Sequence, residues 1–229
     1  MIVQVIRRAE QARRVCRVLV ATDDPRIVEA VQQHGGAVVM TSPNARSGTD
    51  RVAEAARGCE AEIIVNVQGD EPLIHPSTID AAIEPLLDDA SLRISTTSEP
   101  IASVEDVFNP NVVKVVTDLH GFAIYFSRSP IPYPRIGGGR TIEETLRSDP
   151  SALSRYRKHS GLYAYRKAFL EEFSRMEPSP LETAEALEQL RALENGYKIR
   201  VVEVEHRSIG VDTEQDYHRV QKFFEEKTR

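Results

Sequence analysis

The sequence predicts an α/β protein built on a doubly wound, mostly parallel sheet. Short apolar runs alternate with amphipathic segments over about the first ninety residues, which is typical of strands connected by helices. The run 62–67 (EIIVNV) is β-branched and nearly continuous in apolar character, as central parallel strands are. With 229 residues, the chain is long enough to bury a core without disulfides or a metal.

Local signals define the first elements. Asp23-Asp24-Pro25 is a typical start of a helix, and Gly35-Gly36 is a typical stop, so we expect a helix at 25–34. Pro76 opens another helix in the same way. The remaining expected elements of this part are strands at 17–22, 37–40 and 62–67 and helices at 50–57 and 76–88.

The middle and the end of the chain have a different pattern. A hairpin is expected from two strands at 112–116 and 121–126. The prolines of 130–134 exclude a helix there, and Gly137-Gly138-Gly139-Arg140 is expected to be a flexible loop, either a lid or a linker. No domain boundary is evident, so we expect a single domain, 1–229. The last expected elements are strands at 161–165 and 198–204 and helices at 181–195 and 213–227, with Thr213 as a candidate N-cap.

Composition excludes several classes of protein. There are 29 Lys and Arg residues against 35 Asp and Glu, a net charge of −6, which argues against a nucleic-acid or polybasic membrane-binding protein. No apolar run approaches the roughly 18 residues of a membrane span, and the first residues do not form a signal peptide. Cys16 and Cys59 have neither zinc-site nor disulfide spacing. We therefore expect a soluble cytoplasmic protein with free thiols.

The strongest chemical signal is the segment 66–72 (NVQGDEP), where a buried strand ends at a turn rich in polar groups. Ligands bind at the carboxyl ends of strands in open α/β sheets. Asp70 is therefore placed to hold a hard cation such as Mg²⁺, which uses one or two carboxylates. An ordinary Gly-Asp turn is the alternative interpretation.

A second acidic residue, Asp212, lies in the segment 209–213 (IGVDT) at the junction with the last helix. Taken alone, Asp212-Thr213 is better explained as a helix cap. Together with Asp70, Asp212 could complete a Mg²⁺ site and leave positions open for phosphate oxygens.

Three further segments carry candidate groups. The segment 47–51 (SGTDR) enters a helix, where N–H groups favour anions and Arg51 adds a cation, although a plain cap fits equally well. Strand alternation places His159, Gly161 and Tyr163 on one face, although a lone histidine is more often structural. The adjacent polar pair at 188–189 would usually be a solvated helix face.

These segments occur together, in a fixed order, over nearly the whole chain. Taken together they resemble the CMP-KDO synthetases (3-deoxy-manno-octulosonate cytidylyltransferases), which is far more specific than any single motif. The matching segments are 20–24 (VATDD), 47–51 (SGTDR), 66–72 (NVQGDEP), 108–114 (FNPNVVK), 125–133 (YFSRSPIPY), 159–166 (HSGLYAYR), 178–182 (PSPLE), 187–191 (LEQLR) and 210–213 (GVDT).

The resemblance implies a nucleotide-diphospho-sugar transferase-like fold and a defined reaction. The family transfers CMP from CTP to the anomeric hydroxyl of KDO, an eight-carbon acidic sugar, releases pyrophosphate, and supplies lipopolysaccharide synthesis. It also implies a homodimer in which a smaller antiparallel subregion, about 100–160, contributes to dimerisation and the sugar site. Mg²⁺ is implied as the cofactor, with Asp70 and Asp212 as its ligands and the catalytic residues, and the metal would lower the pKa of the attacking hydroxyl.

The resemblance also assigns binding residues by their match to the family's motifs. Arg128 is included in the sugar site as a cation for a carboxylate or phosphate. His159 is implied as a binding residue, since a metal-activated hydroxyl needs no general base. The implied nucleotide site is Ser47, Gly48, Thr49, Asp50, Arg51 and Gln68, and the implied sugar site is Gln68, Arg128, His159, Tyr163, Glu188 and Gln189.

Two departures from the family's pattern matter. Lys158 stands where Arg is usual, which keeps the charge but loses the bidentate fork. Residues Met1–Val3 align after the family's first strand and its Gly/Arg/Lys-rich triphosphate loop, so we expect open sheet edges and little CTP turnover in the chain as written. The alternatives are a cytidylyltransferase for a related sugar acid, such as sialic acid or an amino-KDO, and a non-catalytic binding or dimerisation module.

Overall fold

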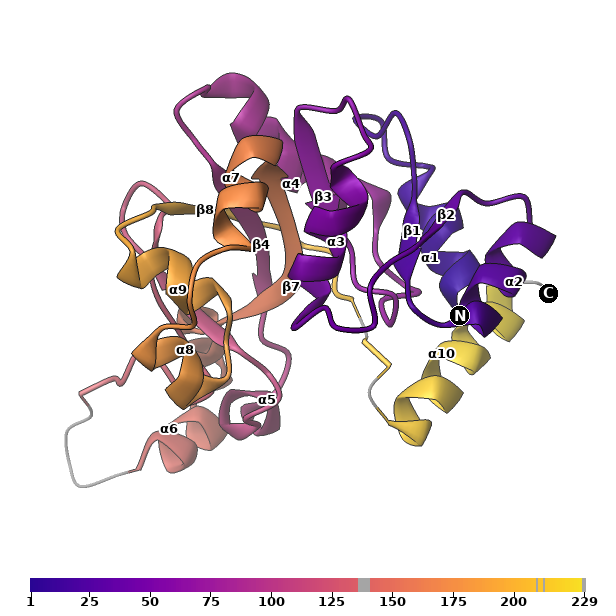
Figure 1. Ribbon diagram of the computed structural model, residues 1–229. Helices are drawn as coiled ribbons and strands as arrows, with labels where there is room; N and C mark the ends of the chain where they lie inside the picture. The colour runs from indigo at the N-terminus through magenta and orange to yellow at the C-terminus, as the bar shows by residue number, and fades with distance from the viewer. Residues whose placement is uncertain (136–140, 209, 212, 228–229) are drawn as a thin grey trace.

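Two sheets organise the computed structural model, which describes residues 1–135, 141–208, 210–211 and 213–227 (Figure 1). In the smaller sheet, β1 (Val20–Thr22) pairs in parallel with β2 (Val38–Met40). The larger sheet has the order β6-β5-β7-β4-β8, with β3 paired to β7. Its strands are β3 (Ile63–Asn66), β4 (Ile94–Pro100), β5 (Lys114–Thr117), β6 (Ala123–Ser127), β7 (Arg157–Arg166) and β8 (Ile199–Glu203).

The predicted α/β class is confirmed, but the larger sheet is mixed rather than mostly parallel. Strand β7 runs antiparallel to β3, β4 and β5, and among the described strands of this sheet only β4 and β8 form a parallel pair. Strand β7 is ten residues long, and it pairs with β4 along its course and with β3 and β5 near its two ends. The predicted hairpin is confirmed as the antiparallel β5–β6 pair. Among the described strands, β1 and β3 each pair on one side only.

Most of the predicted helices are present and begin at the expected caps. The Asp24 carboxylate accepts a hydrogen bond from the N–H of Arg26 (2.8 Å), and Thr213 Oγ1 accepts one from the N–H of Asp216 (3.2 Å). The helices that follow from these signals are α2 (Pro25–Gln33), α3 (Gly48–Ala56), α4 (Pro76–Asp88) and α10 (Glu214–Lys227).

Several other elements are additions or corrections to the expected order. The predicted helix 181–195 is wrong as one element, because Ala186 adopts a left-handed conformation (φ 51°) and divides it into α8 (Pro180–Glu185) and α9 (Gln189–Glu194). The elements that the pattern did not predict are α1 (Ile2–Ala9), β4, α5 (Val104–Phe108), α6 (Ile142–Ser148), the 3₁₀ helix η1 (Pro150–Arg155) and α7 (Lys167–Phe173).

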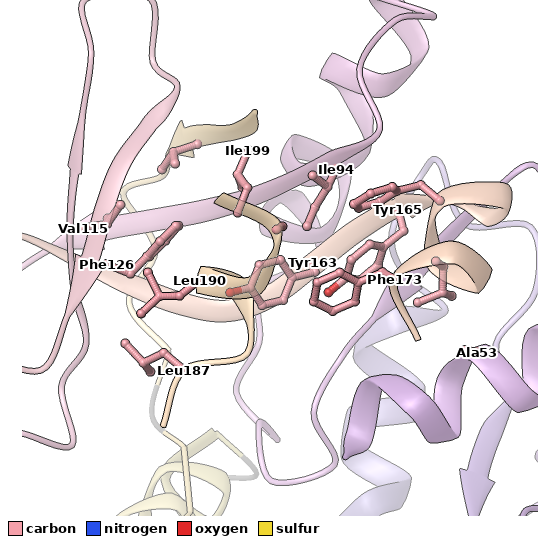
Figure 2. Packing of buried hydrophobic residues seen from close by; sticks show 14 of the residues in the cluster. Ala53, Ile94, Val115, Phe126, Tyr163, Tyr165, Phe173, Leu187, Leu190 and Ile199 are labelled. Carbon is pink, nitrogen blue, oxygen red and sulfur yellow. The ribbon is translucent and has the colours of Figure 1, made fainter. Parts of the chain in front are cut away.

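Apolar clusters cover both faces of the larger sheet. On one face, aromatic residues of β7 and α7 pack with residues from α3, α9 and β8, as Figure 2 shows around Tyr163, Tyr165 and Phe173. On the other face, α4 and the end of α1 pack against β7 through residues such as Ile79 and Leu162. A third cluster joins α5, α6 and η1. The sheet is therefore covered by helices on both faces, as in doubly wound folds.

Figure 1 shows β1, β2, α1, α2 and α10 at one end of the molecule and α5, α6, α8 and α9 at the other. The carboxyl end of β3 and the first residues of α3 lie between these two groups. Within the described ranges, none of the helices combines the length and apolar character of a membrane span. The predicted loop 137–140 and the predicted ligand Asp212 lie outside the described residues.

Candidate active site

Hydrogen bonds join three segments that are far apart in the sequence. At the end of β3, Asn66 Nδ2 donates to Thr49 Oγ1 (3.3 Å), and Gln68 Nε2 donates to Asn66 Oδ1 (3.4 Å). The Thr49 hydroxyl donates in turn to the carboxylate of Glu188. Gly48 is close to the same amide, since a Cβ built on it would lie 3.5 Å from Gln68 Oε1. The structure thus brings the predicted segments at 47–51, 66–72 and 187–191 to one place.

The segment Ser47–Arg51 is a helix cap as well as part of this site. Ser47 Oγ accepts a hydrogen bond from the N–H of Asp50 (3.2 Å), so the capping interpretation is correct. Asp50 pairs with Arg46 (3.0 Å). Arg51 pairs with Asp23 (3.0 Å) and donates to a threonine hydroxyl beside β2 (2.6 Å). Arg51 is therefore held at the carboxyl ends of β1 and β2.

Glu188 and Gln189 are not a solvated helix face. Gln189 is only 5% exposed, and Glu188 Oε2 is buried without a hydrogen-bond partner among the described residues. Burial raises the pKa of the Glu188 carboxyl, and the hydrogen bond from Thr49 opposes that shift. A buried acceptor without a partner is costly, so this oxygen is suited to accept a hydrogen bond from a ligand.

His159 and Tyr163 lie on one face of β7, as the alternation predicts, with ring centroids 5.2 Å apart. Thr96 Oγ1 donates its one hydrogen to the carbonyl of Leu162 (2.6 Å) and lies 2.9 Å from His159 Nε2. Nε2 must therefore be protonated and donate to Thr96 Oγ1. This tautomer leaves Nδ1 of His159 as a hydrogen-bond acceptor. Burial, aided by the nearby Lys158, lowers the pKa of His159 to about 3, so the ring is neutral.

Tyr163 adds a second polar group in this apolar setting. Its hydroxyl is buried without a hydrogen-bond partner among the described residues, and burial raises its pKa well above the usual value. Figure 2 shows Tyr163 between Leu190 and Phe173, with its hydroxyl at the end of an otherwise apolar ring. The neutral phenol is therefore available to hydrogen-bond a bound molecule.

Asp70 lies in a turn that closes the end of β3. The N–H of Glu71 donates to the carbonyl of Gln68 (3.3 Å), and the N–H of Val211 donates to the carbonyl of Asp70 (2.9 Å). The segment before Asp212 therefore contacts the Asp70 turn, although Asp212 itself is not among the described residues.

The groups near this turn fit Mg²⁺ by their chemistry. Asp70 and Gln68 offer only oxygen and amide ligands, and Mg²⁺ prefers oxygen and uses one or two carboxylates. The described part of the chain contains no group of three or more His, Cys, Asp or Glu side chains that could enclose a metal. Among the described residues, Asp70 could therefore contribute one carboxylate to a bound Mg²⁺.

Arg128, a predicted sugar-site residue, has several partners within the protein. Its guanidinium donates to the carbonyls of Glu185 (2.6 Å), Pro110 (2.9 Å) and Ala186 (3.1 Å). Its backbone N–H donates to the Glu185 carboxylate (2.9 Å). Arg128 therefore fixes the turn between α8 and α9 that leads to Glu188.

Sequence reasoning missed three residues that organise this site: Asn66, Thr96 and Glu185. Asn66 belongs to the quoted motif, and its place at the end of a strand was the available signal. Thr96 lies in a polar strand that the apolar pattern could not reveal. Glu185 gives no local signal, because its role depends on Arg128, which lies 57 positions away.

Comparisons with known proteins agree with this geometry. Residues 1–199 match the family model described as cytidylyltransferase. The 3-deoxy-manno-octulosonate cytidylyltransferase of Geobacter sulfurreducens is 54% identical over 220 residues, which cover 96% of this chain and 87% of that protein. The protein of the same name from Pelobacter propionicus is 53% identical, over 98% of this chain and 87% of its own length.

The chain belongs to the 3-deoxy-manno-octulosonate cytidylyltransferase family. Among solved structures, a CMP:2-keto-3-deoxy-manno-octonic acid synthetase complexed with CTP has a TM-score of 0.87 and 40% identity, covering 99% of this chain and 88% of that chain. The 4-diphosphocytidyl-2C-methyl-D-erythritol synthase of Anaerococcus prevotii has a TM-score of 0.58 at 12% identity, covering 98% and 88% of the two chains. The second comparison shows a shared fold alone, whereas the first supports membership of the cytidylyltransferase family.

Proposed function

We propose that this cytidylyltransferase transfers CMP from CTP to the anomeric hydroxyl of KDO, releasing pyrophosphate and supplying CMP-KDO for lipopolysaccharide synthesis. The observation that carries the proposal is the meeting of Thr49, Gln68 and Glu188 at the carboxyl end of β3. The protein complexed with CTP is similar over nearly the whole chain. The curated relatives carry the name of the same activity.

The polar groups of the site suit a polyhydroxylated ligand. Glu188 Oε2 and the Tyr163 hydroxyl are both buried and lack hydrogen-bond partners among the described residues. Glu188 would accept from a sugar hydroxyl, since a carboxylate would repel the carboxylate of the sugar acid. Tyr163 can donate, and Nδ1 of neutral His159 can accept. Ordering these hydroxyls would hold the sugar for in-line attack on the α-phosphate.

We propose that Asp70 and Asp212 hold Mg²⁺ in this reaction. The bound ion would neutralise charge on the phosphate oxygens and lower the pKa of the attacking hydroxyl. Among the chain's own groups, the α3 N-terminal segment Ser47–Arg51 and Gln68 would line the nucleotide. Arg128 would act at the sugar site mainly by fixing the turn that bears Glu188.

We also propose a homodimer and a cytoplasmic location. Large apolar side chains are exposed in the middle subregion, including Leu119, Ile124 and Tyr133, which are 102%, 61% and 78% exposed, and these could pack against a second copy. Cys16 and Cys59 are both free thiols, which fits a reducing compartment.

A pyrophosphate-release assay tests the proposed reaction. We expect pyrophosphate release to be highest with CTP and KDO together, and far lower when UTP replaces CTP or sialic acid replaces KDO. Turnover that prefers sialic acid or an amino-KDO would contradict the assignment of KDO and support a related sugar-acid enzyme. Binding of CTP without turnover for any sugar acid would favour the binding-module alternative.

A further inference from the structure

Three charged side chains converge on Ser208, in the segment that follows β8. The N–H of Ser208 donates to Glu99 Oε2 (2.9 Å), and Lys158 Nζ donates to the carbonyl of Ser208 (3.3 Å). The Ser208 hydroxyl donates to the carboxylate of Glu71. One residue is therefore held by the turn after β3, by β4 and by β7.

Glu99 and Lys158 are themselves a pair. They are cross-strand partners in the antiparallel β4–β7 ladder, and Lys158 Nζ lies 2.7 Å from Glu99 Oε1. The Glu99 side chain is 2% exposed, so its carboxylate depends on this cation and on the N–H of Ser208. The pair connects the strand that bears His159 to the segment after β8.

The same segment is fixed again three residues later. The N–H of Val211 donates to the carbonyl of Asp70 (2.9 Å). A Cβ built on Gly210 would lie 3.3 Å from Glu71 Oε1, so the backbone passes close to the Glu71 side chain. In the sequence, Asp212 follows directly.

We infer that Glu99 and Lys158 are positioning residues for the metal site at Asp70. Through Ser208 and Glu71 they hold the segment after β8 against the turn that bears Asp70, and so fix the orientation of that turn. This inference rests on the proposed function. Neither residue would touch the nucleotide or the sugar. Loss of such outer partners lowers metal affinity by about 10- to 100-fold in known sites.

The test compares two substitutions that each break an ion pair made by a side chain of β7. Glu99→Gln removes the charge that pairs with Lys158. Glu203→Gln is the matched control, because Glu203 pairs with Arg157 (3.4 Å) on the same strand as Lys158 but, within the described part of the chain, makes no hydrogen bond to Ser208 or Val211. Binding of Mn²⁺ alone is measured by electron paramagnetic resonance of the free ion. We expect affinity to fall about tenfold in Glu99→Gln and less than about twofold in Glu203→Gln.

Lys158 gives a second, independent comparison. Lys158→Met should weaken Mn²⁺ binding as Glu99→Gln does, whereas Lys158→Arg should restore it, since the cation is kept. In turnover, the Mg²⁺ concentration for half-maximal rate should rise in both weakened variants, while kcat at saturating Mg²⁺ stays close to wild type. A role in folding alone would not produce this dependence on metal concentration.

Wild-type Mn²⁺ affinity in folded Glu99→Gln and Lys158→Met would overturn the inference. If those variants do not fold, Ser208→Ala decides, because it removes only the hydroxyl bond to Glu71 from a half-buried residue. Absence of Mn²⁺ binding to the wild type would also overturn it. The proposed function is judged separately by turnover of CTP with KDO, so the two failures are distinguishable.

Discussion

The hydroxyl of Thr49 donates a hydrogen bond to the carboxylate of Glu188, although the two residues lie 139 positions apart. Asn66 donates to the same hydroxyl oxygen (3.3 Å). This small network joins the first turn of α3 to the start of α9 at the carboxyl end of β3. Each of these connections is a single hydrogen bond between distant elements. Removal of one donor should therefore produce a measurable change in stability and in substrate binding.

Replacing Thr49 by valine tests this connection, since the two side chains have nearly the same shape. The change leaves a buried carboxylate without its donor, so we expect the free energy of unfolding to fall by about 1–3 kcal/mol. The KM for the sugar acid should also rise, because Glu188 loses its fixed orientation. Urea denaturation and steady-state kinetics measure the two effects.

Thr183→Val is the matched control for Thr49→Val. Thr183 is exposed, and among the described residues its hydroxyl bonds only to the carbonyl of Ser179, the N-cap of α8 (2.9 Å). The unfolding free energy of the Thr183→Val variant should differ from that of the wild type by less than about 0.5 kcal/mol. Equal stability and equal kinetics in the two variants would contradict the role given to Thr49.

Local patterns predicted much of this site because its parts begin or end regular elements. The Ser47 cap, the end of β3 and the shared face of His159 and Tyr163 follow from spacing within a few residues. The apolar core face of α9 and the direction of β7 could not be predicted from local spacing. Both depend on which strands, distant in the sequence, lie beside these elements in the fold.

Strand β4 shows why the rest was missed. Its sequence, ISTTSEP, is polar, yet the strand is buried between β7 and β8. The side chains find partners that only the fold supplies: Thr96 bonds the carbonyl of Leu162, and Glu99 bonds Lys158. The burial of Glu188 was missed for the same reason, since it depends on Thr49 in another helix.

Asp70→Asn should abolish the proposed metal function. The substitution removes the charge but keeps the side-chain shape and the backbone carbonyl that bonds Val211. We expect Mg²⁺-dependent pyrophosphate release to fall at least about a hundredfold, since metal stabilisation of the transition state contributes several kcal/mol. Asp88→Asn, at the exposed last residue of α4, is the control and should stay near wild type. Retained turnover in Asp70→Asn would remove Asp70 from the metal role.

Because His159 is buried, we expect the stability of the fold to depend on pH in a specific way. Burial lowers its pKa to about 3 in the folded state, against an ordinary value of 6.5. The unfolded state then binds the proton more readily, so the contribution to stability is complete above about pH 6.5 and is lost progressively toward pH 3. At pH 5 the loss relative to pH 7.5 should be about 2 kcal/mol.

His159→Gln isolates this contribution, because an amide can still donate to Thr96 and does not titrate. Between pH 7.5 and pH 5 the variant should lose about 2 kcal/mol less unfolding free energy than the wild type. His34→Gln, at an exposed histidine, should follow the wild type. Parallel losses in wild type and His159→Gln would show that the His159 ring is not held neutral.

Arg191 holds α9 in place, and its loss should affect both stability and sugar binding. Its guanidinium forms a bidentate pair with Glu182 of α8, with Nε 2.7 Å from Oε2, and also donates to the carbonyls of Phe173 (3.3 Å) and Met176 (3.2 Å). Both side chains of the pair are about nine-tenths buried, at 7% and 12% exposure. Arg191→Met should therefore lower the free energy of unfolding by about 3–5 kcal/mol, since Glu182 is left as a buried charge. It should also raise the KM for the sugar acid more than that for CTP.

Arg93→Met is the control, because it breaks an ion pair that is about half exposed; it should lower the free energy of unfolding by less than about 1 kcal/mol. A similar small cost for Arg191→Met would show that apolar packing, rather than this pair, fixes α9.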